Sequence, residues 1–163
     1  THGIPDALKS LPNGIRSSNR AVAETLENNV RSKIIKDHLI DPKFYEEMSK
    51  VLDLIVKERK ENAIAYEEYL NKIKKLIENI KRGATEDIPK TINTPALKAL
   101  YNNLDKNEQL AIDVDSVIRN SKRADWRGNL AAENEIKKAI YGVIPDVDEV
   151  NSVFEIVKEQ RDY

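Results

Sequence analysis

Cysteine is absent from the 163-residue sequence, which excludes disulfide bonds, thiolate metal sites, iron–sulfur clusters and a cysteine nucleophile. Glycine and proline are scarce, with five and six residues, and 40% of the residues are hydrophobic. This composition excludes collagen-like chains and Gly/Pro-rich disordered chains. Charged residues make up 34% of the sequence, so it predicts a globular protein with a strongly solvated surface.

The chain also lacks an excess of one charge, because it has 27 basic and 28 acidic side chains and a formal net charge of -1. Such a chain has no overall field that draws it to DNA or to an anionic membrane. No stretch approaches the ~20 apolar residues of a membrane span, and no signal-peptide core opens the chain. We therefore expect no membrane partner and a cytoplasmic location. Because the sequence begins at Thr1, without a methionine, we expect a piece of a longer protein.

Helical periodicity dominates the chain from residue 19 onward. Apolar residues recur at intervals of three and four within the segments 19–39, 42–55, 64–80, 95–101, 110–118, 129–140 and 147–157. Thr94-Pro95 and Asn129 are typical of helix starts, and Gly83 is typical of a helix end. We predict an all-α fold, an irregular bundle of six to eight helices that forms one domain over residues 19–163.

Three segments are less certain from the pattern. No breaker separates Ile55 from Ile64, so one long helix and two helices that meet near Asn62 are both compatible with the sequence. Residues 88–92 are compatible with an extended segment. Residues 1–18 contain prolines and an Asn-Gly pair without a sustained period, which predicts an extended N-terminal arm or linker.

Catalysis usually requires side chains that converge, and the sequence offers few candidates. The two histidines, His2 and His38, favour neither a metal site nor a general base, since one lies at the terminus and the other near a helix end. No glycine precedes a lysine, which excludes a Walker-type phosphate loop. Adjacent acidic residues such as Glu46 and Glu47 diverge by about 100° around a helix and are typical of a solvated face. We predict no catalytic residue, metal or other cofactor in this chain.

Parts of a sequence motif of metal-dependent nucleases nevertheless occur in the chain. Its Glu-x-Lys part is found in Glu58-Arg59-Lys60 and Glu135-Ile136-Lys137, and its Pro-Asp part in Pro5-Asp6 and Pro145-Asp146. That chemistry needs the carboxylates and the lysine on adjoining strands around one Mg²⁺, whereas these residues are predicted in turns and helices. A small free-standing helical nuclease that uses carboxylates and Mg²⁺ is therefore an alternative function.

Two local clusters of basic residues are candidates for binding DNA, because phosphate binding uses such side chains to displace counterions. The first cluster follows one predicted helix and consists of Lys72, Lys74, Lys75, Lys81 and Arg82. The second surrounds the only tryptophan and consists of Arg119, Lys122, Arg123, Trp126 and Arg127. Stacking of the tryptophan on a base would add to the second. The alternative is structural, with basic residues at helix ends and the tryptophan at the edge of the core.

Acidic residues outnumber basic ones between Pro145 and Tyr163, so this end of the chain is expected to avoid phosphate. Phe154 belongs to the apolar stripe of the last predicted helix. Together with Tyr163 it is a candidate for binding a partner protein. Packing of the same stripe against the bundle itself is the alternative.

Several pieces of the sequence carry a family resemblance. The most specific are Asn93-Thr94-Pro95-Ala96-Leu97 with Leu100-Tyr101, Trp126-Arg127-Gly128-Asn129, and the ending from Phe154 to Gln160 with Tyr163. Weaker ones are Glu24, residues 28–31, Tyr66-Glu67 and Tyr69-Leu70. With these pieces nearly the whole chain resembles the C-terminal end of the R subunits, the motor and restriction subunits, of type I restriction-modification enzymes.

The resemblance implies a parent chain with an upstream Mg²⁺-dependent nuclease domain and two helicase-like ATPase domains that move DNA past a bound methyltransferase core. That parent would be a type I site-specific deoxyribonuclease with ATP-dependent translocase activity, and its ATP and Mg²⁺ would bind outside this segment. The family's C-terminal helical region is associated with assembly onto the methyltransferase and specificity subunits, which are the partners that the resemblance implies.

We therefore predict a non-catalytic assembly domain that docks the motor subunit on the methyltransferase core, with direct DNA contact left open. This segment would be no enzyme by itself. Besides the nuclease, a purely structural spacer that packs on the motor domains is an alternative.

Overall fold

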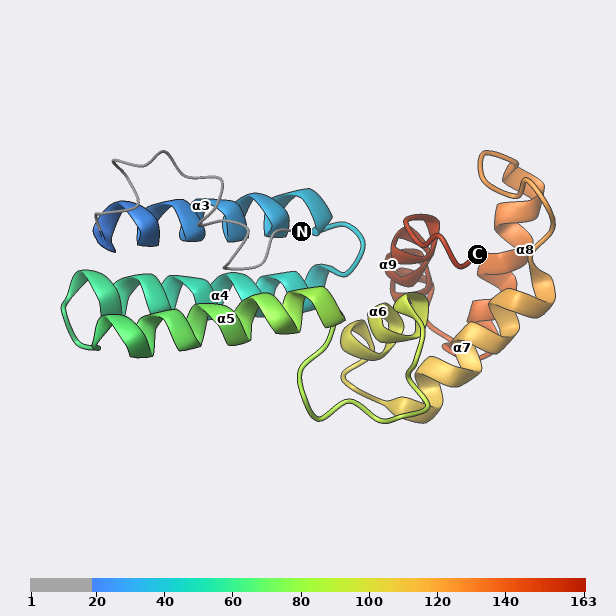
Figure 1. Cartoon of the computed structure of the whole chain (residues 1–163). Helices are drawn as coiled ribbons and strands as arrows, with labels where there is room; N and C mark the ends of the chain where they lie inside the picture. The colour runs from blue at the N-terminus through green and yellow to red at the C-terminus, as the bar shows by residue number, and fades with distance from the viewer. Residues whose placement is uncertain (1–18) are drawn as a thin grey trace. The chain divides into compact units, whose positions relative to one another are not determined.

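The computed structural model describes residues 19–163 (Figure 1). This part of the chain contains seven α-helices and no strand. In chain order the helices are α3 (Asn19–Asp37), α4 (Pro42–Lys60), α5 (Tyr66–Arg82), α6 (Pro95–Asn103), α7 (Glu108–Ser121), α8 (Leu130–Tyr141) and α9 (Val147–Lys158). The predicted all-α fold of six to eight helices is confirmed. The expected N-terminal arm, residues 1–18, lies outside the described residues.

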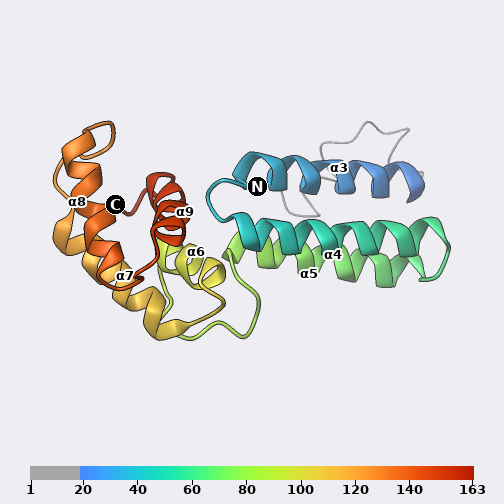
Figure 2. The ribbon, with the colours of Figure 1, turned by 180° about the vertical axis from the view of Figure 1, so that it is seen from behind.

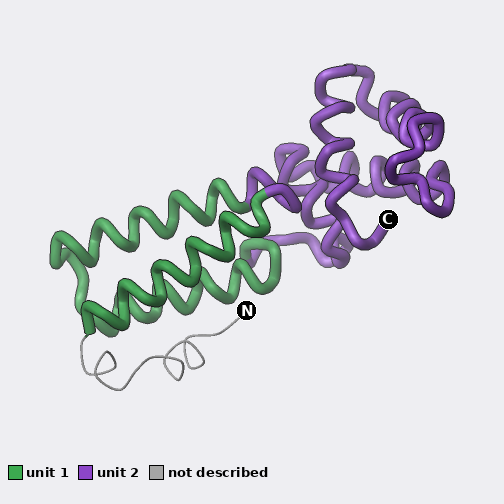
Figure 3. Tube along the Cα trace, turned by 90° about the horizontal axis from the view of Figure 1, so that it is seen from above, with its two compact units in different colours: residues 1–38, 45–85 green, residues 39–44, 86–163 purple. Residues whose placement is uncertain are grey.

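The described residues divide into two compact units (Figure 3). Unit 1 contains residues 19–38 and 45–85, and unit 2 contains residues 39–44 and 86–163. α4 therefore begins in unit 2 and continues in unit 1. Residues 19–163 were expected to form one domain. Both units use the same amphipathic spacing, and no linker-like composition separates them.

Unit 1 is a three-helix assembly of α3, most of α4, and α5, and Figures 1 and 2 show α4 and α5 running side by side. Each helix buries one apolar stripe, and Leu26, Leu52 and Ile73 are each at most 1% exposed. Burial of one such side chain stabilises the folded state by about 1.5–3 kcal/mol, so these stripes hold the three helices together.

The turn between α4 and α5 resolves the uncertainty near Asn62 in favour of two helices. Asn62 has a φ of 52°, in the left-handed region that asparagine tolerates better than most residues. The main-chain N–H of Ala63 donates to the carbonyl of Glu58 at 2.9 Å and closes the turn. At its other end α5 stops at Gly83, as predicted, where a φ of 69° needs no Cβ.

Unit 2 contains α6 to α9, and a side-chain cap fixes the start of each helix. Thr94, Asn107, Asn129 and Asp146 each accept a hydrogen bond from the main-chain N–H three residues later. The starts at Thr94 and Asn129 were predicted from the sequence. Residues 88–92 form no strand, and the N–H of Ile92 instead donates to the carbonyl of Pro89 at 3.0 Å in a turn.

Candidate functional site

Trp126 lies in the hydrophobic core of unit 2 and is only 2% exposed. Its ring packs against Phe154 with centroids 5.8 Å apart, and its Nε1 donates to the main-chain oxygen of Tyr163 at 3.1 Å. The indole is therefore not available to stack on a base, and this part of the DNA-binding prediction is wrong. The structural alternative for the tryptophan holds, since its polar edge and its apolar face are both used inside the fold.

Two of the basic residues around Trp126 contact the C-terminal segment, which consists of residues 158–163. Arg127 donates from Nε to the carbonyl of Lys158 at 3.0 Å and from Nη2 to the carbonyl of Gln160, and its guanidinium lies 4.4 Å from the centre of the Trp126 ring. Lys122 donates from Nζ to the main-chain oxygen of Tyr163 at 3.3 Å. Their N–H groups therefore donate to main-chain oxygens of this chain.

The remaining two basic residues of this cluster pair with carboxylates. Arg119 donates from Nε to Asp115 at 3.0 Å, which raises the pKa of the guanidinium, and it lies 5.1 Å from the centre of the Tyr163 ring. Arg123 donates to Glu135 at 2.6 Å. Arg119, Lys122 and Arg127 thus contact Tyr163 or the residues before it, whereas Arg123 is 69% exposed and pairs with Glu135 on α8.

Phe154 and Tyr163, the predicted partner-binding residues, face the interior. They are 1% and 7% exposed, and the hydroxyl of Tyr163 donates to Asp115. Burial is the main cause that raises the pKa of this hydroxyl above its ordinary value. Both rings stabilise unit 2, so the prediction that they meet a partner is corrected to the alternative, packing within the fold.

The rest of the C-terminal segment is equally well bound. The carboxylate of Asp162 accepts from the main-chain N–H of Ala96 at 2.8 Å, in the first turn of α6. Gln160 donates from Nε2 to the carbonyl of Ile40 at 2.8 Å. Residues far apart in the sequence therefore meet at this segment of unit 2.

The other predicted basic cluster lies on α5 in unit 1. Lys72 is half-buried and donates to Glu58 at 2.7 Å, a hydrogen bond that raises the pKa of its ammonium group. The remaining members are exposed on the helix surface: Lys74, Lys75, Lys81 and Arg82. Four basic side chains of this cluster are therefore exposed on one helix.

Residues of the nuclease alternative are dispersed. Glu58 pairs with Lys72 in unit 1, Glu135 pairs with Arg123 in unit 2, and Asp146 caps α9. Pro5-Asp6 lies outside the described residues. Over residues 19–163, no three side chains of the metal-ligating types are grouped so that they could hold an ion.

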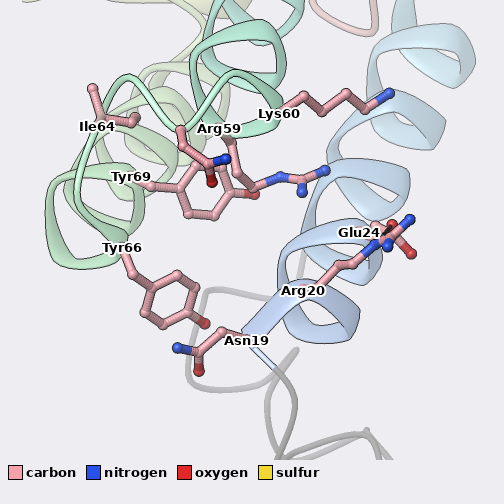
Figure 4. A pocket seen from close by; sticks show the side chains of 9 residues that line it. Asn19, Arg20, Glu24, Arg59, Lys60, Ile64, Tyr66 and Tyr69 are labelled. Atoms are coloured by element: carbon pink, nitrogen blue, oxygen red, sulfur yellow. Dashed lines mark hydrogen bonds and ion pairs between the residues drawn. The ribbon is translucent and has the colours of Figure 1, made fainter.

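Unit 1 contains a pocket of about 530 Å³ that was not predicted from the sequence (Figure 4). The start of α3, the end of α4, the following turn and the start of α5 form it. Its lining consists of Asn19, Arg20, Glu24, Arg59, Lys60, Asn62, Ile64, Tyr66 and Tyr69. The lining comes from separate segments of the sequence. The only signal for it in the sequence is the pair of tyrosines, Tyr66 and Tyr69, at helical spacing.

A buried ion pair supports one wall of the pocket. Arg59 donates to both carboxylate oxygens of Glu27, at 2.7 and 3.0 Å, and the two side chains are 15% and 8% exposed. The Arg59 guanidinium also lies 6.0 Å from the centre of the Tyr69 ring. Tyr69 donates from its hydroxyl to the carbonyl of Ala23 at 3.2 Å, and burial raises its pKa. This wall is therefore fixed by contacts among all three helices.

The mouth of the pocket is more exposed. Arg20 donates from Nε to Glu24 at 3.0 Å, and this hydrogen bond lowers the pKa of the carboxyl group. Tyr66 stacks on Tyr69, with ring centroids 6.1 Å apart and planes inclined by 19°. Figure 4 shows Tyr66 directed from α5 toward Asn19 at the start of α3. Aromatic and cationic side chains thus meet at one opening.

Residues 19–163 contain no helix that combines the length and the apolar character needed to cross a membrane. Comparisons of the chain with protein-family models, with curated proteins and with solved structures give no match.

Proposed function

We propose that this chain is a helical assembly domain of a type I restriction enzyme motor subunit. Its role is to dock that subunit on the methyltransferase and specificity subunits. The ATP-dependent translocation and the DNA cleavage of the complex belong to other domains of the parent chain, which use ATP and Mg²⁺.

One observation carries the proposal: the three most specific pieces of sequence that resemble the R subunits lie together in unit 2, while the weaker pieces lie on α3 and α5 in unit 1. The segment 93–97 contacts the C-terminal segment through Ala96 and Asp162, at 2.8 Å. The segment 126–129 contacts it through Trp126 and Tyr163, at 3.1 Å. Residues of all three pieces belong to one hydrophobic core of unit 2: Ala96, Leu97, Leu100, Trp126, Phe154, Val157 and Tyr163. Their convergence supports a resemblance to one folded unit.

Contact with DNA is the second part of the proposal, and the exposed basic residues of α5 support it. Lys74 and Lys81 are seven residues apart, which places them nearly two turns apart on one side of the helix. The variant Lys74→Glu/Lys81→Glu is expected to weaken DNA binding more at low salt than at high salt. Its matched control is Lys36→Glu/Lys50→Glu, which changes the charge of unit 1 equally on α3 and α4. Equal affinity of both variants at low salt removes the DNA contact from the proposal.

A competition experiment tests the assembly role. Full-length motor subunit, the methyltransferase and specificity subunits encoded with it, ATP and Mg²⁺ are combined with a DNA substrate. Excess purified chain is expected to inhibit ATP-dependent cleavage, because it occupies the docking site on the core, and added core is expected to restore cleavage. Trp126→Ala is the control, since its disrupted unit 2 is expected not to compete. Cleavage that the folded chain leaves unchanged at large excess contradicts the proposal.

A further inference from the structure

The pocket of unit 1 has one basic side chain more than its two ion pairs use, Lys60. Three basic side chains and one acidic side chain line it. Arg59 is engaged by Glu27 on both carboxylate oxygens, so its charge is largely balanced inside the wall. Arg20 is paired through Nε with Glu24, which balances its charge, while its terminal nitrogens carry four further N–H donors. With the exposed Lys60, Arg20 makes the mouth of this pocket suited to an anion.

The same pocket contains an aromatic platform. Tyr69 is 1% exposed and held by its hydroxyl, whereas Tyr66 is only half-buried and stacks on it. A second planar ring on the outer side of Tyr66 would extend this stack, and such stacking is a general way to bind nucleic-acid bases. Ile64 adds an apolar contact beside the rings. The platform favours a ligand with a flat, partly apolar group.

Two amide side chains complete the lining. Asn19 begins α3, and Asn62 occupies the left-handed position of the turn that follows α4. An amide offers both donors and acceptors, which suits the hydrogen-bonding edge of a base. The volume of about 530 Å³ lies within the range usual for small-ligand pockets.

We propose that this pocket binds a nucleoside phosphate, with the base on Tyr66 and the phosphate at Lys60 and Arg20. The ligand is either a free nucleotide or one nucleotide of an unpaired DNA strand, since both present the same chemistry. This site lies in unit 1 and does not depend on docking to the methyltransferase core.

Calorimetric titration of the whole chain with dAMP tests the site, with inorganic phosphate and deoxyadenosine titrated separately. The proposal expects saturable binding of dAMP that is tighter than the binding of either part, because base and phosphate contacts are made together. A deoxyadenylate strand of about five nucleotides distinguishes the two sources. Tighter binding of the strand identifies unpaired DNA as the ligand, and tighter binding of dAMP identifies a free nucleotide.

Variants then separate the two contacts. Tyr66→Ala is expected to weaken binding by about fivefold or more, while Tyr66→Phe keeps the ring and keeps the affinity. Tyr141→Ala, which removes an exposed tyrosine in unit 2, is the matched control. Lys60→Glu is expected to weaken binding and to reduce its salt dependence. Lys57→Glu makes the same charge change one turn earlier on α4, outside the lining, and is expected to have a smaller effect.

Circular dichroism of each variant establishes that the helices are retained. The proposal is overturned if neither dAMP nor the strand binds saturably to the folded chain. It is also overturned if Tyr66→Ala and Lys60→Glu bind as tightly as the parent chain, or if Lys57→Glu and Tyr141→Ala lose as much affinity as they do.

Discussion

Trp126 and Tyr163 are 37 positions apart in the sequence and are joined by a hydrogen bond of 3.1 Å from the indole Nε1 to a main-chain oxygen. The indole is buried, so water does not readily replace its N–H as the donor to this oxygen. The segment after α9 is therefore an integral part of unit 2.

Replacement of Trp126 is expected to destabilise unit 2. Trp126→Phe removes the donor to Tyr163 and part of the ring volume, and we expect a loss of about 2 kcal/mol in the free energy of unfolding. Urea unfolding followed by circular dichroism measures it. Leu130→Ala, at a side chain that is 72% exposed, is the control and should change the free energy by less than about 0.5 kcal/mol. Equal stability of the two variants would contradict the structural role of Trp126.

The ion pair between Glu27 and Arg59 is expected to matter because it is buried. Arg59→Met leaves the Glu27 carboxylate without its bidentate partner, and we expect unit 1 to lose about 3 kcal/mol of stability. The double variant Glu27→Leu/Arg59→Met removes both charges and should recover much of the loss. Hydrogen exchange of the α3 and α5 amides is the measurement.

The exposed pair Arg20 and Glu24 provides the comparison, because its side chains are 83% and 49% exposed. Arg20→Gln is expected to change exchange in α3 and α5 far less than Arg59→Met does. If the two substitutions have equal effects, burial is not what makes the Arg59 pair important.

Stability at alkaline pH is expected to depend on Tyr163. Burial and the hydrogen bond to Asp115 raise its pKa in the folded chain above the ordinary value of 10.0. Above pH 10 the unfolded chain therefore loses this proton while the folded chain keeps it. The stabilisation is complete below that pH and falls as the pH rises toward the folded pKa, by up to about 1.4 kcal/mol per pH unit.

Tyr163→Phe has no proton to lose at this position. It is expected to be less stable at neutral pH, by about 1 kcal/mol, and to lose stability less steeply above pH 10. Urea unfolding at several pH values, read from the fluorescence of the only tryptophan, reports on unit 2. Tyr141→Phe is the matched control and should leave the alkaline slope of the parent chain in place. Identical slopes for both variants would rule out the contribution of Tyr163.

Asp41 is expected to stabilise the start of α4 within unit 2. Its carboxylate is 5% exposed and accepts from the main-chain N–H of Phe44 at 3.3 Å and from the amides of Asn102 and Asn103, at 2.8 and 2.6 Å. Asp41→Ala should cost about 2 kcal/mol, measured by tryptophan fluorescence in urea. Asp87→Ala, at an exposed aspartate of unit 2, should leave the curve nearly unchanged. Coincident curves for the two variants would refute the role assigned to Asp41.

Much of the fold could be predicted from local signals. The spacing of apolar residues places the helices, and Thr94, Asn129 and Gly83 mark ends because caps act on their immediate neighbours. The division into two units left no such signal, since it depends on which stripes pack together. Asn62 was ambiguous because a left-handed asparagine is permitted, and not required, by the sequence.

The candidate sites were harder to predict for a related reason. The charge of a basic cluster can be read from the sequence, but the partners of its side chains cannot. Asp115 pairs with Arg119, and the carbonyl of Lys158 accepts a hydrogen bond from Arg127. Burial of Trp126 follows from contacts with Phe154 and Tyr163, which are long-range. The unit 1 pocket joins Arg20 to residues that are about forty positions away in the sequence, so only the tertiary structure brings them together.

The molecular mass of the methyltransferase core, measured after it is mixed with this chain, tests the central claim most directly. Light scattering after size exclusion should give the core a mass increase of 18.6 kDa for each bound chain, and the Trp126→Ala variant should leave the mass of the core unchanged. A folded chain that elutes apart from the core, with the mass of the core unaltered at micromolar concentrations, would contradict an assembly role.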